Sequence, residues 1–273
     1  MLIFTFALVI LLVGSLPWMA IFRLSNKPAW LMAFYLIVSA NVTVSSYIAN
    51  SFYLLNLRWV MLGLHILIGG LGWLIWKRAG SPHLWTPFQN WGIKFDIQWL
   101  KREPVLVLML LIIVICYLFA FVQVILIPQN NMDALSTHLS RIGFWLQHGS
   151  FFPWPTTMPN QIWYPVVVQL QTYWTLLFLG GDRMVGSVQW LAALISGVGV
   201  FGMARLLGYP QRSSAFAALV FMSFPLVALQ ATTTQTDLVT VAFFIPAIYF
   251  LILGIKDGQT SLLSLSAISV GLG

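Results

Sequence analysis

Charged side chains are scarce in this chain of 273 residues, where they make up 7% of the sequence. Soluble domains carry about 25% charged residues, so the scarcity excludes an ordinary soluble globular protein. Acids are the rarest charged type, with six Asp and Glu in the whole chain. The single cysteine, Cys116, lies in an apolar run; it excludes an internal disulfide and leaves the compartment open.

Hydrophobic residues make up 60% of the sequence, and the mean hydropathy is +0.90. This composition predicts an integral membrane protein, and the 13 Trp and eight Tyr fit interfacial aromatic belts. In a soluble protein the pI of about 9.8 would suggest nucleic acid as a partner. Here the basic residues lie mostly in short loops between apolar runs, so orientation in the bilayer explains them and no nucleic acid is expected.

The apolar runs predict an all-α polytopic membrane protein. The expected spans are residues 2–22, 29–49, 59–76, 104–127, 184–204, 213–230 and 238–255. The first run lacks a preceding basic region, so we expect a retained helix with its N-terminus outside rather than a signal peptide. A last run from residue 261 stops without a polar flank, as expected for a fragment or a truncated product.

Residues 164–180 form the one ambiguous run, because Gln169, Gln171 and Thr172 interrupt it and Pro165 stands near its start. If this run lies in the interface, ten basic residues fall inside and three outside. If it crosses, the ratio becomes eight to five. The positive-inside rule therefore favours an interfacial helix, and it places Asp133 and Asp237 on the same external side.

Two long loops flank the span at residues 104–127. The external loop, residues 128–183, predicts an amphipathic helix over 134–148, a proline-rich turn region, and then the interfacial helix. The inner loop, residues 77–103, carries five basic residues together with Trp85, Trp91 and Trp99. We expect this inner loop to lie on an anionic leaflet.

Asp133 lies near the start of the polar loop that follows the span at residues 104–127, and it is one of only six acids in the chain. A carboxylate held where a span meets water can act on a lipid-borne substrate and still exchange protons. Asp133 also suits the N-cap of the following helix. Asp237 allows the same two interpretations, because it closes a polar run and opens the span at residues 238–255.

His138, Arg141, Trp145 and His148 share one face of the helix expected over 134–148. One arginine and two histidines on a polar face suit a phosphate, for which Arg is the better bidentate partner. The competing interpretation is an ordinary solvated face of an interfacial helix. Within the spans, His65 is the main ionisable candidate, and we interpret it as a hydrogen-bonded packing residue.

Several segments in order resemble GT-C type glycosyltransferases, the family 39-like protein O-mannosyltransferases and aminoarabinose transferases that use polyprenyl-phosphate sugars. The resemblance covers residues 131–256 and rests on order and spacing. Its segments are DALSTHLSR (133–141), WLQHGS (145–150), IWYP (162–165), DR (182–183), VQW (188–190), ARLLG (204–208) and QTD (235–237). Val166 stands where many relatives have a second proline, and three spans precede the usual first loop.

The resemblance implies a GT-C-like helix bundle and a division of the chain into two parts. Residues 1–103 would form N-terminal spans with a basic cytoplasmic loop. Residues 104–273 would form the catalytic membrane core, with the external loop 128–183 on the outer side of the cell (plasma or inner) membrane. The resemblance also implies that Asp133 is the first-loop catalytic acid, that Asp237 is the second external acid, and that Arg183 follows the juxtamembrane helix.

The expected reaction transfers a sugar from a polyprenyl phosphate to an acceptor hydroxyl, and the resemblance implies inversion. Asp133 would be the base. His138, Arg141, Arg183 and Gln235 would bind substrate, with Arg141 or Arg183 on the phosphate. The cofactor stays open: a divalent metal is compatible with Asp237 as a ligand, but the sequence supplies no recognisable ligand set.

Three alternatives stay open. A lipid-linked polysaccharide polymerase or ligase would depend on external Arg and His residues and tolerate loss of Asp133. A transporter or flippase would need ionisable groups in the middle of its spans. A non-catalytic membrane scaffold would tolerate loss of both external acids. The sequence does not indicate the sugar or the acceptor.

Overall fold

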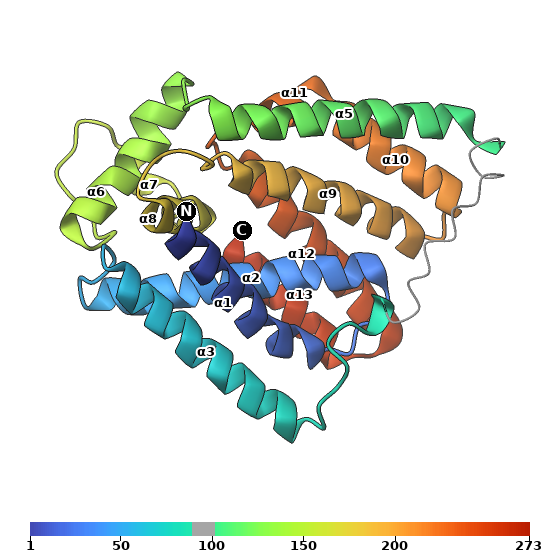
Figure 1. Cartoon of the computed structure of the whole chain (residues 1–273). Coiled ribbons are helices and arrows are strands. Elements are labelled where there is room, and N and C mark those ends of the chain that lie inside the picture. The colour runs from blue at the N-terminus through green and yellow to red at the C-terminus, as the bar shows by residue number, and fades with distance from the viewer. Residues whose placement is uncertain (89–101) are drawn as a thin grey trace.

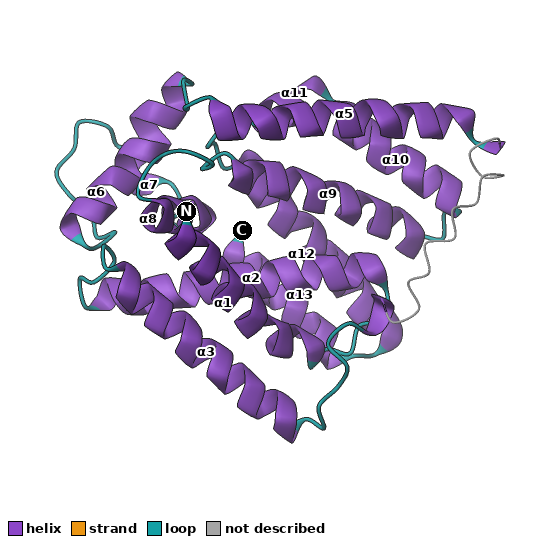
Figure 2. Ribbon diagram, in the orientation of Figure 1, coloured by secondary structure: helices purple, strands orange, loops and turns teal. Residues whose placement is uncertain are grey.

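The computed structural model describes residues 1–88 and 102–273, and every regular element within these ranges is a helix (Figure 2). This confirms the predicted all-α class. The inner loop is described only up to residue 88 and from residue 102. The expectation that its tryptophans Trp91 and Trp99 lie on a leaflet therefore falls outside the described residues.

Six helices in the described ranges are long and apolar enough to cross a membrane. They are α1 (Leu2–Ala20), α2 (Lys27–Ser51), α3 (Arg58–Arg78), α5 (Pro104–Leu126), α9 (Ser187–Leu206) and α12 (Asp237–Asp257). Each begins and ends within three residues of a predicted span. The prediction of a polytopic membrane bundle is confirmed.

The remaining elements are short. They are η1 (Thr86–Phe88), the π-helical turn η2 (Ala134–Leu139), α6 (Ser140–His148), α7 (Asn160–Trp163), η3 (Val167–Gln169), α8 (Leu170–Leu179), α10 (Gln211–Ser223), α11 (Pro225–Gln230) and α13 (Thr260–Leu272). In Figure 1, η2, α6, α7 and α8 gather at one end of the long helices. The turn from α9 to α10 lies at the other end.

The apolar helix over Val167–Leu179 has 13 residues, which span about 20 Å. A bilayer core is about 30 Å thick, so this helix is too short to cross. Figure 1 shows α8 nearly end-on while α2, α5 and α9 run across the view. This orientation is the one predicted for an interfacial helix.

The expected span at residues 213–230 is wrong as a single helix. α10 ends at Ser223 and α11 begins at Pro225, with Phe224 between them in an extended conformation. Proline lacks an N–H, and its ring disfavours the helical conformation for the residue before it. Pro225 therefore ends one helix and occupies the first turn of the next, where its missing N–H costs nothing.

Two buried apolar clusters hold the helices together. The larger joins α2, α9, α12 and α13, and the smaller joins α1, α2 and α3 to α6 and α8. In the smaller cluster, the α-carbons of Gly14 and Gly69 meet so closely that a Cβ on Gly69 would lie 2.9 Å from Gly14. Small residues allow such close approach between membrane helices. Both clusters combine helices from before and after residue 103, so the two parts of the chain share their cores.

His65 is fully buried and links the spans to the interfacial helix. Its Nε2 accepts a hydrogen bond from the Trp174 indole N–H at 2.8 Å, so its Nδ1 carries the proton. That Nδ1 lies 2.8 Å from Asn41 Oδ1 and 3.2 Å from the Ser45 hydroxyl. The interpretation of His65 as a hydrogen-bonded packing residue is confirmed.

Candidate functional site

Asp133 does not cap the helix that follows it. The side chain of Asn131 takes that role, since its Oδ1 accepts the N–H groups of Asp133 at 2.9 Å and Ala134 at 3.4 Å. The Asp133 carboxylate makes no capping hydrogen bond. Its side chain is 46% exposed, so the carboxylate is available at the surface of the external segment.

The π-helical turn η2 brings His138 beside Asp133. Residues five apart on an α-helix point about 140° away from each other, whereas the wider π turn pairs residue i with i+5. His138 Nε2 accordingly lies 3.4 Å from Asp133 Oδ2. The α-helix expected from the sequence over residues 134–148 would keep these two side chains apart, so the pair was not predicted.

Gln235 reaches the same carboxylate from a distant part of the chain. Its Nε2 donates to Asp133 Oδ2 at 3.3 Å, and its backbone N–H donates to the Thr233 hydroxyl at 3.3 Å. This bond joins the loop before α12 to the residue just before η2. The sequence predicted that Gln235 and Asp133 belong to one site, and the two side chains are in contact. Two donors, one from each segment, hold the same oxygen of Asp133.

Gln169 fixes the protonation of His138. Arg141 can only donate, and its Nη1 lies 3.0 Å from Gln169 Oε1, so the amide nitrogen of Gln169 must be on the other side. That nitrogen donates to His138 Nδ1. His138 is therefore the neutral tautomer with its proton on Nε2, which it directs to Asp133.

Burial favours the same neutral form. His138 is 4% exposed, and desolvation lowers its pKa below the usual 6.5. The carboxylates of Asp133 and Asp237 act against this shift, and the Arg141 charge adds to it. At neutral pH, His138 can therefore donate a hydrogen bond to Asp133 without forming an ion pair.

Arg141 is buried, whereas the sequence suggested a phosphate ligand on a polar face. Its side chain is 1% exposed, with Nη2 donating to the Tyr164 carbonyl at 2.6 Å and Nη1 to the Pro165 carbonyl at 3.3 Å. The guanidinium also lies 4.9 Å from the centre of the Trp145 ring. Burial lowers the pKa of Arg141 to about 10, which leaves it charged. Direct binding of phosphate by Arg141 is not supported, because its charge is enclosed by protein.

The expected solvated face of this helix is also wrong. His138, Arg141 and Trp145 are buried against protein, and only His148 of the four is exposed. The apolar Leu135 of η2 is instead 48% exposed. The polar face turns inward because Gln169 and the Tyr164 carbonyl supply buried partners for it.

Asp237 lies at the other edge of the site, as the first residue of α12. It is exposed, and its Oδ2 accepts from Gln230 Nε2 at 2.8 Å. The α12 amide of Val239 donates instead to Gln189 Oε1 at 3.0 Å, so a residue of α9 caps this helix. Asp237 is thus free of the capping role, while the helix start still favours its negative charge.

Asp133 and Asp237 line one cavity of about 240 Å³. Both acids and His138 therefore converge, as the sequence analysis expected of the two acids. The rest of the lining comes from the start of the interfacial helix and the loop before α12, namely Tyr164, Pro165, Val168, Gln169 and Thr236. Gln235 contacts this group through Asp133, whereas Arg183 is exposed in the turn between α8 and α9 and does not line the cavity.

Gln169 is the important residue that the sequence analysis did not select. In the sequence Gln169 stands out only as a polar residue inside an apolar run. That feature makes the run a doubtful span but does not point to a site. In the described part of the chain, no group of three His, Cys, Asp or Glu side chains is arranged to hold a metal ion. The expectation that Asp237 is compatible with a metal stays a prediction.

Comparison with known proteins gives one result. Residues 159–273 match the family model of the dolichyl-phosphate-mannose-protein mannosyltransferases. No curated protein and no solved structure matches the chain. The matched stretch holds Gln169, Gln235 and Asp237, and it overlaps the segments whose order resembled GT-C enzymes. Residues 159–273 are thus similar to this family, and together with the six apolar helices the match supports a membrane glycosyltransferase of the GT-C type.

Proposed function

We propose that this glycosyltransferase moves a sugar from a polyprenyl-phosphate donor to an acceptor hydroxyl at the outer membrane face, with inversion. The observation that carries the proposal is the cavity shared by Asp133 and Asp237 at the end of the helix bundle. Both carboxylates stand where the spans end, so a donor whose lipid stays in the bilayer can present its sugar to them.

Asp133 is the proposed base. His138 and Gln235 both lie against its Oδ2, and among the described residues none donates a hydrogen bond to Oδ1. The acceptor oxygen attacks the anomeric carbon while the bond from that carbon to the phosphate oxygen breaks. The acceptor proton passes to Oδ1 of Asp133. A single displacement without a covalent intermediate inverts the anomeric carbon.

The neutral state of His138 supports this assignment. A protonated imidazole would compete with the acceptor hydroxyl as a proton source for Asp133. The neutral ring only orients the carboxylate by donating from Nε2. Arg141 acts through Gln169 as a positioning residue, because its charge is enclosed.

The leaving phosphate needs a cation. The sequence suggested Arg141 or Arg183, and Arg183 remains because Arg141 is buried. Arg183 is exposed in the turn before α9, at the end of the bundle that carries the cavity. Asp237 keeps one carboxylate oxygen beside Gln230 and offers the other to a sugar hydroxyl or a divalent cation.

The outer location rests on charge. Most of the described basic residues lie at the end opposite the cavity, where α3 ends with Lys77 and Arg78 and α9 ends near Arg205. The positive-inside rule places that end in the cytoplasm.

The test is Asp133→Asn with a lipid-linked sugar supplied. We expect turnover to fall about 10²–10⁴-fold, the usual contribution of a positioned base, with unchanged thermal stability. Asp182→Asn is the matched control, since Asp182 is an exposed acid of the same external segment that does not line the cavity. Near-normal turnover in Asp133→Asn would contradict the proposal and favour a polymerase or ligase that works without this acid.

A further inference from the structure

A small polar pocket lies where α5 ends, beside the candidate site but with a lining of its own. It has a volume of about 140 Å³, which leaves room for several water molecules or for one sugar ring. Most of its lining consists of uncharged amide and hydroxyl side chains, namely Gln123, Gln129, Asn130, Asn131, Thr232 and Thr233, with Ile127 and Pro128.

Four amide groups in this pocket keep hydrogen-bonding capacity for a ligand. Gln129 uses its Nε2 on the Thr232 carbonyl at 3.1 Å, and Asn131 uses its Oδ1 as the helix cap. Their other amide atoms make no hydrogen bond to the described part of the chain, and the side chains of Gln123 and Asn130 make none there either. An amide both donates and accepts, as a sugar hydroxyl does.

An apolar cleft continues from the pocket between α5 and α11. The cleft has a volume of about 180 Å³ and shares Gln123 and Thr232 with the pocket. Away from these two residues its lining becomes apolar, with Phe119 and Ala120 of α5 facing Leu229 of α11. Phe119 and Leu229 are exposed, so the cleft opens to the lipid side of the bundle.

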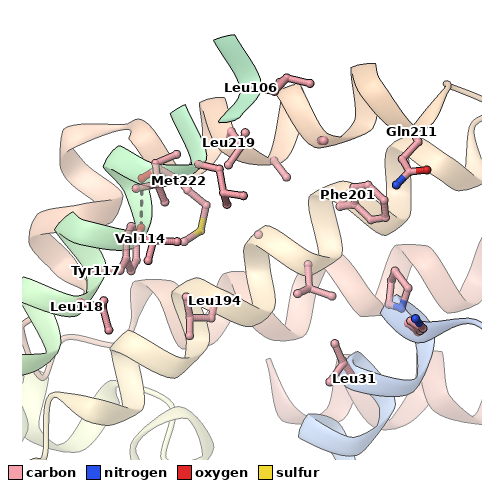
Figure 3. Close-up of a pocket in the computed structure, with 18 of the residues that line it drawn as sticks. Leu31, Leu106, Val114, Tyr117, Leu118, Leu194, Phe201, Gln211, Leu219 and Met222 are labelled. Atoms are coloured by element: carbon pink, nitrogen blue, oxygen red, sulfur yellow. Dashed lines mark hydrogen bonds between the residues drawn. The ribbon is translucent and has the colours of Figure 1, made fainter. Parts of the chain in front are cut away.

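The two spaces follow the depth of one leaflet. The pocket lies at the end of α5, which ends at Leu126, and the cleft extends back along α5 from Gln123 to Cys116, about 10 Å of helix. Half of a bilayer core is about 15 Å thick. At the deep end of the cleft the Tyr117 hydroxyl donates to the Met222 carbonyl at 3.3 Å, drawn as a dashed line in Figure 3, and ties α5 to α10. A lipid chain in the cleft therefore leaves sideways into the bilayer.

The headgroup that fits the pocket is uncharged. The described residues that line the pocket and the cleft include no Lys, Arg, His, Asp or Glu. A phosphate held there would lose water without gaining a cation, which is unfavourable. Neutral hydroxyls would exchange water for the free amides and keep their hydrogen bonds.

The loops that form the pocket also hold the proposed base. Asn131 Oδ1 accepts the N–H of Asp133 at 2.9 Å. The Thr233 hydroxyl accepts the N–H of Gln235 at 3.3 Å, and the Gln235 side chain donates to Asp133. A headgroup in the pocket therefore lies against the two segments that position Asp133.

We propose that the pocket and the cleft bind a membrane lipid with a neutral sugar headgroup, and that this glycolipid is the acceptor. The binding follows from the two adjoining spaces, whereas the acceptor role rests on the proposed function. In the transfer, a headgroup hydroxyl forms the new bond to the anomeric carbon and its proton passes to Asp133. The phosphate leaves with the electrons of the broken bond.

Cys116 tests the binding without any transfer, because it is the single cysteine of the chain, is exposed and lines the cleft. Its modification by a maleimide is measured on the full chain in detergent. Glucosyl diacylglycerol at about ten times its Kd should slow the modification about tenfold. Diacylglycerol and phosphatidylglycerol at the same concentration should leave the rate unchanged, and equal protection by either would overturn the neutral sugar headgroup. Displacement of the glycolipid by equimolar maltose would assign the pocket to a free glycan and overturn the lipid.

The double variant Gln123→Leu with Asn130→Ala removes the two unused amides and no hydrogen bond of the folded chain. It should bind glucosyl diacylglycerol about tenfold more weakly, the effect of two lost hydrogen bonds. Gln147→Leu, at an exposed amide of α6 outside both spaces, should keep full protection. Full protection in the double variant would overturn the sugar pocket.

Transfer tests the acceptor role. The double variant should raise KM for glucosyl diacylglycerol about tenfold and leave KM for the lipid-linked donor unchanged. Protection of Cys116 with no sugar added to the bound lipid, while the donor is still consumed, would overturn the acceptor role alone. A wild-type chain that consumes no donor would contradict the proposed function and the acceptor role with it, while protection of Cys116 would still support the binding.

Discussion

At the scale of single residues, hydrogen-bond direction decides the chemistry of the site. The Arg141 guanidinium can donate hydrogen bonds but cannot accept them, so the oxygen of the Gln169 amide must face it. The amide nitrogen therefore donates to His138 Nδ1, which carries no proton. A substitution at Gln169 should therefore change the hydrogen bonding of His138 without removing a direct contact of Asp133. Arg141, which the sequence suggested as a phosphate ligand, instead determines the state of the histidine.

Gln169→Leu removes both hydrogen bonds of the amide. It leaves a buried Arg141 N–H and His138 Nδ1 without partners, and we expect turnover to fall about tenfold through loosened positioning of Asp133. KM for the lipid donor should stay nearly constant, because Arg141 and His138 occupy both polar atoms of the Gln169 amide and neither is offered to substrate. A loss of donor affinity with unchanged kcat would contradict a positioning role.

Gln169→Glu should change the pH dependence. In the native protein burial lowers the His138 pKa below 6.5, so acid converts the neutral ring to its charged form only below that value. A carboxylate at position 169 favours the charged ring and raises the His138 pKa, so activity should begin to fall at higher pH on acidification. The measurement is kcat/KM from about pH 5 to pH 8. Gln147→Glu, an exposed position on α6, should leave the profile unchanged.

At the scale of elements, the sequence was informative where length and charge decide the structure. The six long helices followed from apolar length. The interfacial placement of the run at residues 164–180 was predicted from charge counting, and the short helix over Val167–Leu179 agrees with it. The break at Pro225 was readable, because proline disfavours a continuous helix, yet apolar length was given more weight. The π-helical turn had no signal, since DALSTHLSR fits an α-helix equally well.

The interfacial helix α8 has polar links to two spans, through Gln171 to Tyr35 and Ser39 of α2 and through Trp174 to His65 of α3. Trp174→Phe removes the indole donor and leaves His65 Nε2 buried without a partner, so the free energy of unfolding should fall by about 1–3 kcal/mol. Thermal unfolding in detergent measures the change. Trp163→Phe is the control, because Trp163 is 78% exposed. Equal thermal stability of the two variants would show that the link to His65 does not hold α8.

At the scale of the whole molecule, the two acids of the site and most of the described basic residues lie at opposite ends of the bundle. Asp133 and Asp237 meet in one cavity, although 104 positions apart in the chain, because α5 and α11 end on the same side. Charge counting predicted that shared side. It could not predict the cavity itself, which needs Gln235 to bridge two loops. The division of the chain at residue 103 stays a prediction.

Reporter fusions test this arrangement in the cell. Fusions after Thr157 and Thr234 should both report the outer side, and fusions after Gly208 and Gly258, in turns at the other end, should both report the cytoplasm. Opposite results for Thr157 and Thr234 would mean that residues 164–180 cross the membrane.

The wide turn η2 makes the candidate site sensitive to the winding of the backbone. Asp133 meets His138 because the backbone between them carries one residue more than an α-helical turn would hold. Rewinding the same residues as a plain α-helix would point Asp133 about 140° away from His138. Every reactive side chain would survive such a rewinding, and yet the pairing would be gone. A homologue that keeps this pair on a plain α-helix would therefore carry the two residues four positions apart, one fewer than here.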